Sequence, residues 1–175
     1  MTEQNEMKLA TAEPAAFGLF GLALVTLVAA AMKLGWVDGE HNSFLFVPWA
    51  FMLGAIPQLM TSFMEFRRNN VFGATVFGAY GMFWLGLGLT YMWAFENNLP
   101  PTDYADILGF AFIGYLVFSL YMTIGSMTLN KGLFAVFAFI DLLFVGLVMG
   151  AFFPDTWADW GKFAGWAELG VAITS

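Results

Sequence analysis

The sequence has no cysteine, a single histidine and few charged residues. The absence of cysteine from all 175 residues excludes disulfides, thiolate catalysis and iron–sulfur ligation. The lone His41 cannot supply a bis-histidine haem site or a metal cluster, so we expect a solvated loop residue there and neither cofactor nor metal. Charged residues make up 11% of the chain, against about a quarter in soluble domains, which argues against a water-soluble globule. The net charge of −7 argues against nucleic acid as a partner.

Signatures of enzymatic chemistry are missing as well. The sequence offers no Ser/His/Asp set and no glycine loop that could cradle a phosphate. No lysine sits in the middle of an apolar block, so a retinal Schiff base has no attachment point. Intramembrane enzymes usually carry such groups, and we therefore expect no enzyme.

Apolar residues, by contrast, are abundant and come in long blocks. Hydrophobic residues make up 60% of the chain, and the mean hydropathy is +0.74. A helix needs about 20 apolar residues to span a bilayer. Five blocks reach this length: Ala15–Met32, Phe44–Phe66, Val71–Trp93, Ile107–Met127 and Gly132–Phe153. A sixth block, Phe163–Ser175, is too short to cross, so it is an incomplete helix or one whose continuation is absent from this sequence.

These blocks predict an all-α membrane protein, a bundle of six transmembrane helices with the sixth apparently incomplete, surrounded by a lipid bilayer. Residues 14–175 would form a single transmembrane domain. Residues 1–13 are polar and mostly acidic and lack the basic start of a signal peptide, so we expect a solvated tail.

Basic residues set the expected orientation. Cytoplasmic loops carry an excess of lysine and arginine. The tail and the loops on its side hold Lys8, Arg67, Arg68 and Lys131. The loops on the other side hold Lys33 and Lys162, among many acids. The N-terminus is therefore expected in the cytoplasm.

The apolar blocks contain a few polar residues. Gln58 follows Pro57, which frees a backbone carbonyl because proline lacks an amide donor. Glu65 with Arg67 and Arg68 is interpreted as an interfacial charge cluster. Asp141 lies in FAFIDLLFVGL, where an ionised carboxylate costs about 3 kcal/mol on insertion scales.

Asp141 should therefore face the protein interior, be protonated, or both. One hypothesis makes it a protonatable group beside a substrate path, bonded to Tyr80, Gln58 or a threonine hydroxyl. The other makes it a neutral acid that ties helices together. The same two readings apply to Glu168 in the short last block.

Two passages carry a family resemblance. AEPAAFGLFGLAL, at Ala12–Leu24, is similar to the signature that opens the first helix of the acetate uptake transporter family. QLMTSFMEFRRNNVFGATVFGAYGMFW, at Gln58–Trp84, resembles the same family without a gap. The resemblance covers nearly the whole chain.

This resemblance implies a six-helix protomer, assembly as a hexamer and one substrate path through each protomer. The implied cargo is acetate or a related small carboxylate, with protons as coupled partners. The path would narrow at a constriction made by Leu22, Tyr80 and Ile140.

A substrate-access motif would lie at the start of the first helix. The resemblance places it on Glu13, Pro14, Gly18 and Thr26. Free amides beyond Pro14 could bind an anion if this proline opens the helix. The glutamate departs from the family asparagine, and it could cap these amides itself or repel an incoming carboxylate.

The sequence thus predicts a multi-pass transporter or channel of the inner membrane for acetate-like carboxylates, with proton coupling. The alternative is a passive channel for small neutral solutes such as urea or ammonia, which needs no proton. A second alternative is a structural membrane protein with a fully packed centre and no flux.

Overall fold

The computed structural model describes residues 12–37 and 42–175, and within these ranges the chain forms helices and turns without any strand. His41 and all but the last residues of the expected tail lie outside the described residues. The long helices are α1 (Ala15–Lys33), α4 (Val71–Glu96), α5 (Ala105–Ser126), α6 (Lys131–Phe152) and α7 (Trp157–Thr174). Short 3₁₀ turns, η2 (Pro101–Asp103) and η3 (Pro154–Thr156), precede α5 and α7.

The second span is built from three consecutive pieces, α2 (Asn42–Trp49), the π-helical segment η1 (Ala50–Ala55) and α3 (Ile56–Arg67). Counting these three as one, the described part of the chain contains six long helical segments. Five of the six are long and apolar enough to cross a membrane. The prediction of an all-α membrane bundle is confirmed.

The π-helical segment has an identifiable cause. Pro48 and Pro57 each remove one amide donor from this span, so a regular α-helical ladder cannot run through it. The wider turn of η1 meets α1 at Gly21, where an added Cβ would lie 2.4 Å from the Leu53 carbonyl oxygen. Only glycine permits this approach, because any side chain would collide with the backbone of η1.

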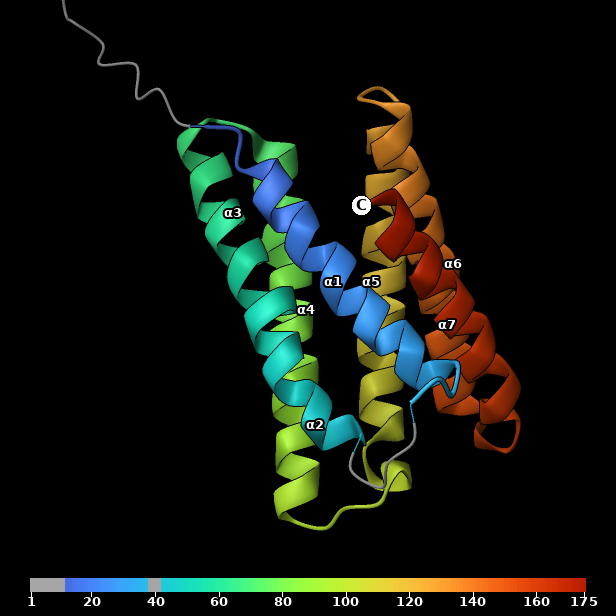
Figure 1. The fold of residues 1–175 in the computed structure, drawn as a ribbon. Helices are drawn as coiled ribbons and strands as arrows, with labels where there is room; N and C mark the ends of the chain where they lie inside the picture. Colours follow the sequence, from blue (N-terminus) through green and yellow to red (C-terminus); the bar gives the residue numbers. More distant parts are fainter. Residues whose placement is uncertain (1–11, 38–41) are drawn as a thin grey trace, which may run out of the picture.

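Helix α1 crosses the centre of the bundle between two groups of helices (Figure 1). It packs against α3 and η1 on one side and against α7 on the other, while α6 packs against both α5 and α7. The described chain starts at the end where α3 turns into α4 and α5 into α6, at the top of Figure 1. We refer to it as the Arg67 end, and to the opposite end, where α1 finishes, as the Lys33 end.

The last helix begins earlier than the apolar pattern indicates. The sequence placed its start at Phe163, whereas α7 begins at Trp157 and has 18 residues. Pro154 opens the preceding 3₁₀ turn, and Asp159 lies in the first helical turn, where a negative charge stabilises a helix N-terminus. Asp159 and Lys162 interrupt the apolar pattern at the start of α7, so a search for apolar runs misses these turns.

Candidate substrate path

Two cavities enter the bundle from opposite ends. The Arg67-end vestibule has a volume of about 520 Å³ and is lined by residues of α1, α3, α4, α6 and α7. The Lys33-end vestibule has a volume of about 580 Å³, and aromatic and aliphatic side chains form most of its walls. A bundle centre of this kind is not fully packed.

The same four helices line both cavities at different depths. Facing the Arg67-end vestibule are Leu22, Tyr80, Ile140 and Thr174. Facing the Lys33-end vestibule are Ala29, Phe83, Leu147 and Glu168. The layer between them contains Val25, Phe144 and Val171, each at most 1% exposed. This layer carries no charged side chain and separates the two vestibules.

Phe144 lies at the centre of an aromatic cluster in this layer. Its ring stacks on Tyr80 and Tyr115, with centroid distances of 6.5 and 5.7 Å, and meets Phe83 edge-on at 5.3 Å. Aromatic pairs in these geometries are attractive. Phe144 was not predicted as a path residue, although it follows Ile140 by one helical turn on the same face of α6.

Leu22, Tyr80 and Ile140, the predicted constriction residues, all line the deep part of the Arg67-end vestibule, and each is at most 6% exposed. The structure therefore brings these three side chains together. The Tyr80 hydroxyl lies near Ser119 and Asp141 and interacts with the Ser119 hydroxyl. Neither hydroxyl reaches the standard geometry of a hydrogen bond to a described residue.

The predicted access motif lies beside the Arg67-end vestibule and does not line it. Pro14 occupies the position before α1, one residue earlier than expected, and its carbonyl oxygen accepts a hydrogen bond from the Thr61 hydroxyl at 3.2 Å. Glu13 does not cap α1, because it pairs with Arg68 at 2.7 Å. The predicted anion site at this helix start therefore has no side-chain cap, and of residues 14–17 only Ala15 lines the vestibule.

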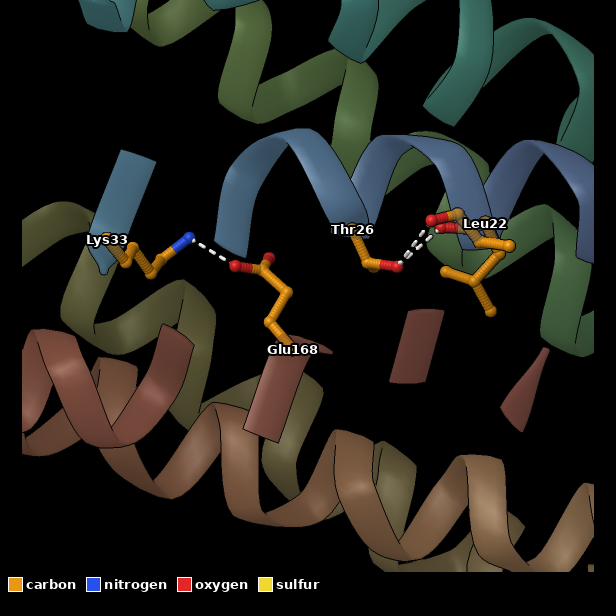
Figure 2. Close-up of polar contacts among 5 residues, drawn as sticks. Leu22, Thr26, Lys33 and Glu168 are labelled. Atoms are coloured by element: carbon orange, nitrogen blue, oxygen red, sulfur yellow. Dashed lines mark hydrogen bonds and ion pairs between the residues drawn. The ribbon is translucent and has the colours of Figure 1, made fainter. Parts of the chain in front are cut away.

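The other two residues of the motif serve packing. At Gly18 an added Cβ would lie 2.5 Å from the Phe77 ring, so this glycine lets α1 and α4 approach closely. Thr26 is fully buried, and its hydroxyl lies 2.7 Å from the Leu22 carbonyl oxygen and 3.2 Å from that of Ala23 (Figure 2). Its hydroxyl is satisfied within its own helix.

Gln58 and Glu65 are completely buried and line the Arg67-end vestibule. Gln58 donates from Nε2 to the Gly54 carbonyl at 3.0 Å, and Glu65 accepts from Asn70 Nδ2 at 2.8 Å. The remaining side-chain oxygen of each has no hydrogen-bond partner among the described residues. Both therefore carry a buried acceptor, without a described partner, in the wall of this vestibule.

The position of Glu65 corrects the expected charge cluster. Arg67 and Arg68 are exposed, whereas Glu65 turns inward and Arg68 pairs with Glu13 instead. The buried polar face of α3 consists of Gln58, Thr61, Ser62 and Glu65. Their i, i+3, i+4, i+7 spacing was a readable signal for a polar helix face turned toward the interior.

Asp141 faces α5 and does not line either vestibule. Its Oδ2 atom lies 2.7 Å from the Thr123 hydroxyl, so a threonine is its partner among those considered from the sequence. Its Oδ1 atom is buried without a hydrogen-bond partner in residues 12–37 and 42–175.

Glu168 lies at the Lys33-end vestibule and forms an ion pair with Lys33, with 2.8 Å between Oε2 and Nζ (Figure 2). Lys33 had been placed in a loop by the sequence, whereas it ends α1 and lines the same cavity. In the described part of the chain, no group of three His, Cys, Asp or Glu residues could hold a metal ion.

Comparison with known proteins assigns almost the whole chain to one protein family. Residues 2–173 match the GPR1/FUN34/yaaH family. The chain is 30% identical over 160 residues to the succinate-acetate/proton symporter SatP of Escherichia coli K12, over 90% of this chain and 81% of the symporter. Its structure resembles that of the bacterial acetate channel SatP with a TM-score of 0.83 and 27% identity, covering 94% of this chain and 87% of the channel.

Fungal relatives are similar in sequence and longer. The chain is 29% identical over 148 residues to acetate permease A of Emericella nidulans, covering 79% of this chain and 49% of the permease. It is 31% identical over 154 residues to ammonia transport outward protein 3 of Saccharomyces cerevisiae, covering 82% of this chain and 53% of that protein. Together with the fold, these findings confirm the resemblance seen in the sequence: the chain belongs to the GPR1/FUN34/yaaH family and is a multi-pass membrane transport protein, not an enzyme.

Proposed function

We propose that this protein moves acetate and related small carboxylates across the inner membrane, coupled to protons, with its N-terminus in the cytoplasm. The observation that carries the proposal is the uncharged layer of Val25, Phe144 and Val171 between the two vestibules, next to the predicted constriction residues Leu22, Tyr80 and Ile140. Cavities on both sides bring a solute close to this layer, and the layer selects which solutes cross the protein.

An apolar layer discriminates by charge and size. Moving a carboxylate out of water into apolar surroundings costs several kcal/mol even after relaxation, about the scale for a buried ion. A neutral acid of two carbon atoms avoids most of this cost. The constriction therefore favours the protonated acid, and transport of an acid with its proton amounts to symport.

The activities named for two relatives support the same cargo. A succinate-acetate/proton symporter and an acetate permease are among the proteins similar to this chain. We propose a hexamer of such protomers, each with its own path. The outward face of α5 suits contacts with lipid or another protomer, because Ile107, Phe110 and Ile124 are all more than 60% exposed.

A passive channel for small neutral solutes is the second candidate. The uncharged constriction would also pass ammonia, and one relative is named an ammonia transport outward protein. The two vestibules argue against a purely structural membrane protein, for which a packed centre is expected.

The deciding experiment is initial uptake of labelled acetate into proteoliposomes, with and without an inward proton gradient, at one external concentration of undissociated acid. Protein-free liposomes run in parallel correct for acetic acid that crosses the bilayer unaided. Protein-dependent uptake that rises with the gradient supports proton-coupled carboxylate transport. Protein-dependent flux of urea that is equal with and without the gradient, in the absence of acetate uptake, would favour the neutral-solute channel.

A further inference from the structure

Lys33 and Glu168 form an ion pair in the wall of the Lys33-end vestibule. Glu168 comes from the middle of α7, and its side chain is 2% exposed, whereas that of Lys33, at the end of α1, is 19% exposed. Both residues line the cavity. An ammonium group has three N–H donors, and the Lys33 ammonium uses one of them, on Glu168, within the described residues. The other two can bind a second carboxylate.

The surroundings of the pair contain little other charge. The described titratable residues that line this cavity are Lys33, Tyr91, Tyr104, Lys162 and Glu168. Tyr91 lies close enough to Glu168 and Tyr104 to interact with both electrostatically. Lys162 is exposed and makes no ion pair with a described residue. Phe83, Trp84 and Leu87 are among the apolar walls, which strengthen any charge interaction at the pair because they keep water away.

We propose that Lys33 and Glu168 together form a carboxylate-binding and proton-loading site, which turns a carboxylate into its neutral acid before the constriction. The inference rests on the function proposed above and names the residues that would couple acid and proton. Lys33 is the anion-binding group, and Glu168 is the proton carrier.

The steps balance in charge and atoms. An incoming carboxylate forms an ion pair with Lys33, and Glu168, which loses its partner, takes one proton from the outer solution. Glu168 then gives this proton to the bound carboxylate. The neutral acid leaves for the apolar layer, and the Lys33–Glu168 pair forms again. One carboxylate and one proton enter, and one undissociated acid moves on.

The competing explanation is a purely structural tie between α1 and α7. Removing one partner of a buried ion pair leaves an unpaired charge and destabilises a protein, whichever role the pair has. Replacing both partners by apolar residues of similar volume is often neutral or stabilising. The double variant K33M/E168M therefore separates the two roles without depending on a single unpaired charge.

The readout is acetate binding to the full chain in lipid nanodiscs, measured by titration calorimetry in buffers of different ionisation enthalpy. This measurement gives both the affinity and the number of protons taken up per acetate. For the unmodified chain we expect one proton per acetate. We expect K33M/E168M to fold with an unchanged melting temperature. Its acetate affinity should fall at least about tenfold, because a charge-assisted hydrogen bond is lost. Unchanged affinity and proton uptake in this variant would overturn the inference and leave a structural tie.

The single variant E168Q gives a more specific result. Glutamine cannot take up the proton and competes less well for Lys33, so proton uptake should vanish while acetate binds about tenfold more tightly at neutral pH. K162M is the matched control, because it removes a lysine of the same cavity that has no carboxylate partner in the described chain. It should keep one proton per acetate.

Uptake into proteoliposomes separates failure of this inference from failure of the proposed function. If the unmodified chain shows gradient-dependent acetate uptake and E168Q and K33M/E168M keep it in full, the inference is wrong and the proposed function stands. If the unmodified chain takes up no acetate above empty vesicles and binds none, the proposed function itself fails.

Discussion

The side chains of Thr123 and Asp141 join α5 to α6, with 2.7 Å between the threonine hydroxyl and Oδ2 of the acid. The same hydroxyl lies 3.0 Å from the Ser119 carbonyl oxygen. A threonine hydroxyl has one proton and can donate to only one of these acceptors. The contact in which Thr123 donates to Asp141 therefore competes with the contact to the Ser119 carbonyl oxygen.

We predict from this contact that Asp141 ties α5 to α6, and two variants test the prediction. In D141N the amide oxygen can accept from Thr123 as Oδ2 does, so we expect an unchanged melting temperature in detergent and unchanged gradient dependence of acetate uptake. D141A removes the contact and should cost about 1 kcal/mol, the scale of an interhelical hydrogen bond in a membrane. If D141N abolishes the gradient dependence while it folds normally, Asp141 carries a proton instead.

A second prediction concerns Asn70, which caps α4 and also supports Glu65. Its Oδ1 atom accepts from the Gly73 amide at 3.2 Å, while its Nδ2 atom donates to the buried Glu65 carboxylate at 2.8 Å. N70A therefore removes a cap, worth about 1 kcal/mol. It also takes the described hydrogen-bond donor from a buried carboxylate, which adds about 1–3 kcal/mol.

Asn130 provides the matched control. It caps α6 by accepting from the Leu133 amide at 2.7 Å, it is exposed, and it bonds to no carboxylate among the described residues. N130A should lose only the cap, about 1 kcal/mol. Thermal unfolding of both variants in the same detergent compares them, and equal losses would show that the Asn70–Glu65 contact contributes nothing.

The sequence was sufficient for the fold because the bilayer leaves few choices. Apolar blocks of spanning length, separated by short polar loops, can only become a helix bundle. What it could not supply were features fixed by neighbouring helices. Asp159 and Lys162 interrupt the apolar pattern at the start of α7, and the close contact of η1 with Gly21 involves another helix.

The sequence predicted only part of the candidate site. Leu22, Tyr80 and Ile140 came from the resemblance, and their positions in the deep vestibule follow from the helix pattern. The Lys33–Glu168 pair spans 135 positions in the chain, so no local pattern could join the two residues. Glu65 was misread because two arginines follow it, although the helical period of α3 points it inward.

The contact of α1 with η1 predicts a contrast between two glycines. G21A would place a Cβ 2.4 Å from the Leu53 carbonyl oxygen and 2.8 Å from Pro57 Cβ, so the two helices must separate. Overpacking of this kind costs about 1–3 kcal/mol. It should also lower acetate uptake, because Gly21 precedes the constriction residue Leu22.

Gly86 is the control, since an added Cβ there meets nothing within 4 Å. In the interior of α4, alanine at this position should gain up to about 1 kcal/mol in helix propensity. Thermal unfolding and acetate uptake of G21A and G86A in parallel measure the contrast. A G21A variant as stable as the unmodified chain would contradict the close approach of α1 and η1.

The last prediction concerns the size limit set by the constriction. Ile140 is 3% exposed, lines the Arg67-end vestibule and lies one turn before Phe144. I140A shortens a side chain next to the uncharged layer and leaves room for additional methylene groups of a substrate. We expect initial uptake of butyrate relative to acetate to rise about tenfold, the lower range for one or two methylenes in an apolar site. Stability should fall by about 2–5 kcal/mol, as for other buried truncations.

Leu142 provides the control, because it lies on the same helix and is 45% exposed. L142A should leave the butyrate-to-acetate ratio unchanged. The same ratio in I140A and L142A would show that Ile140 does not set the size limit.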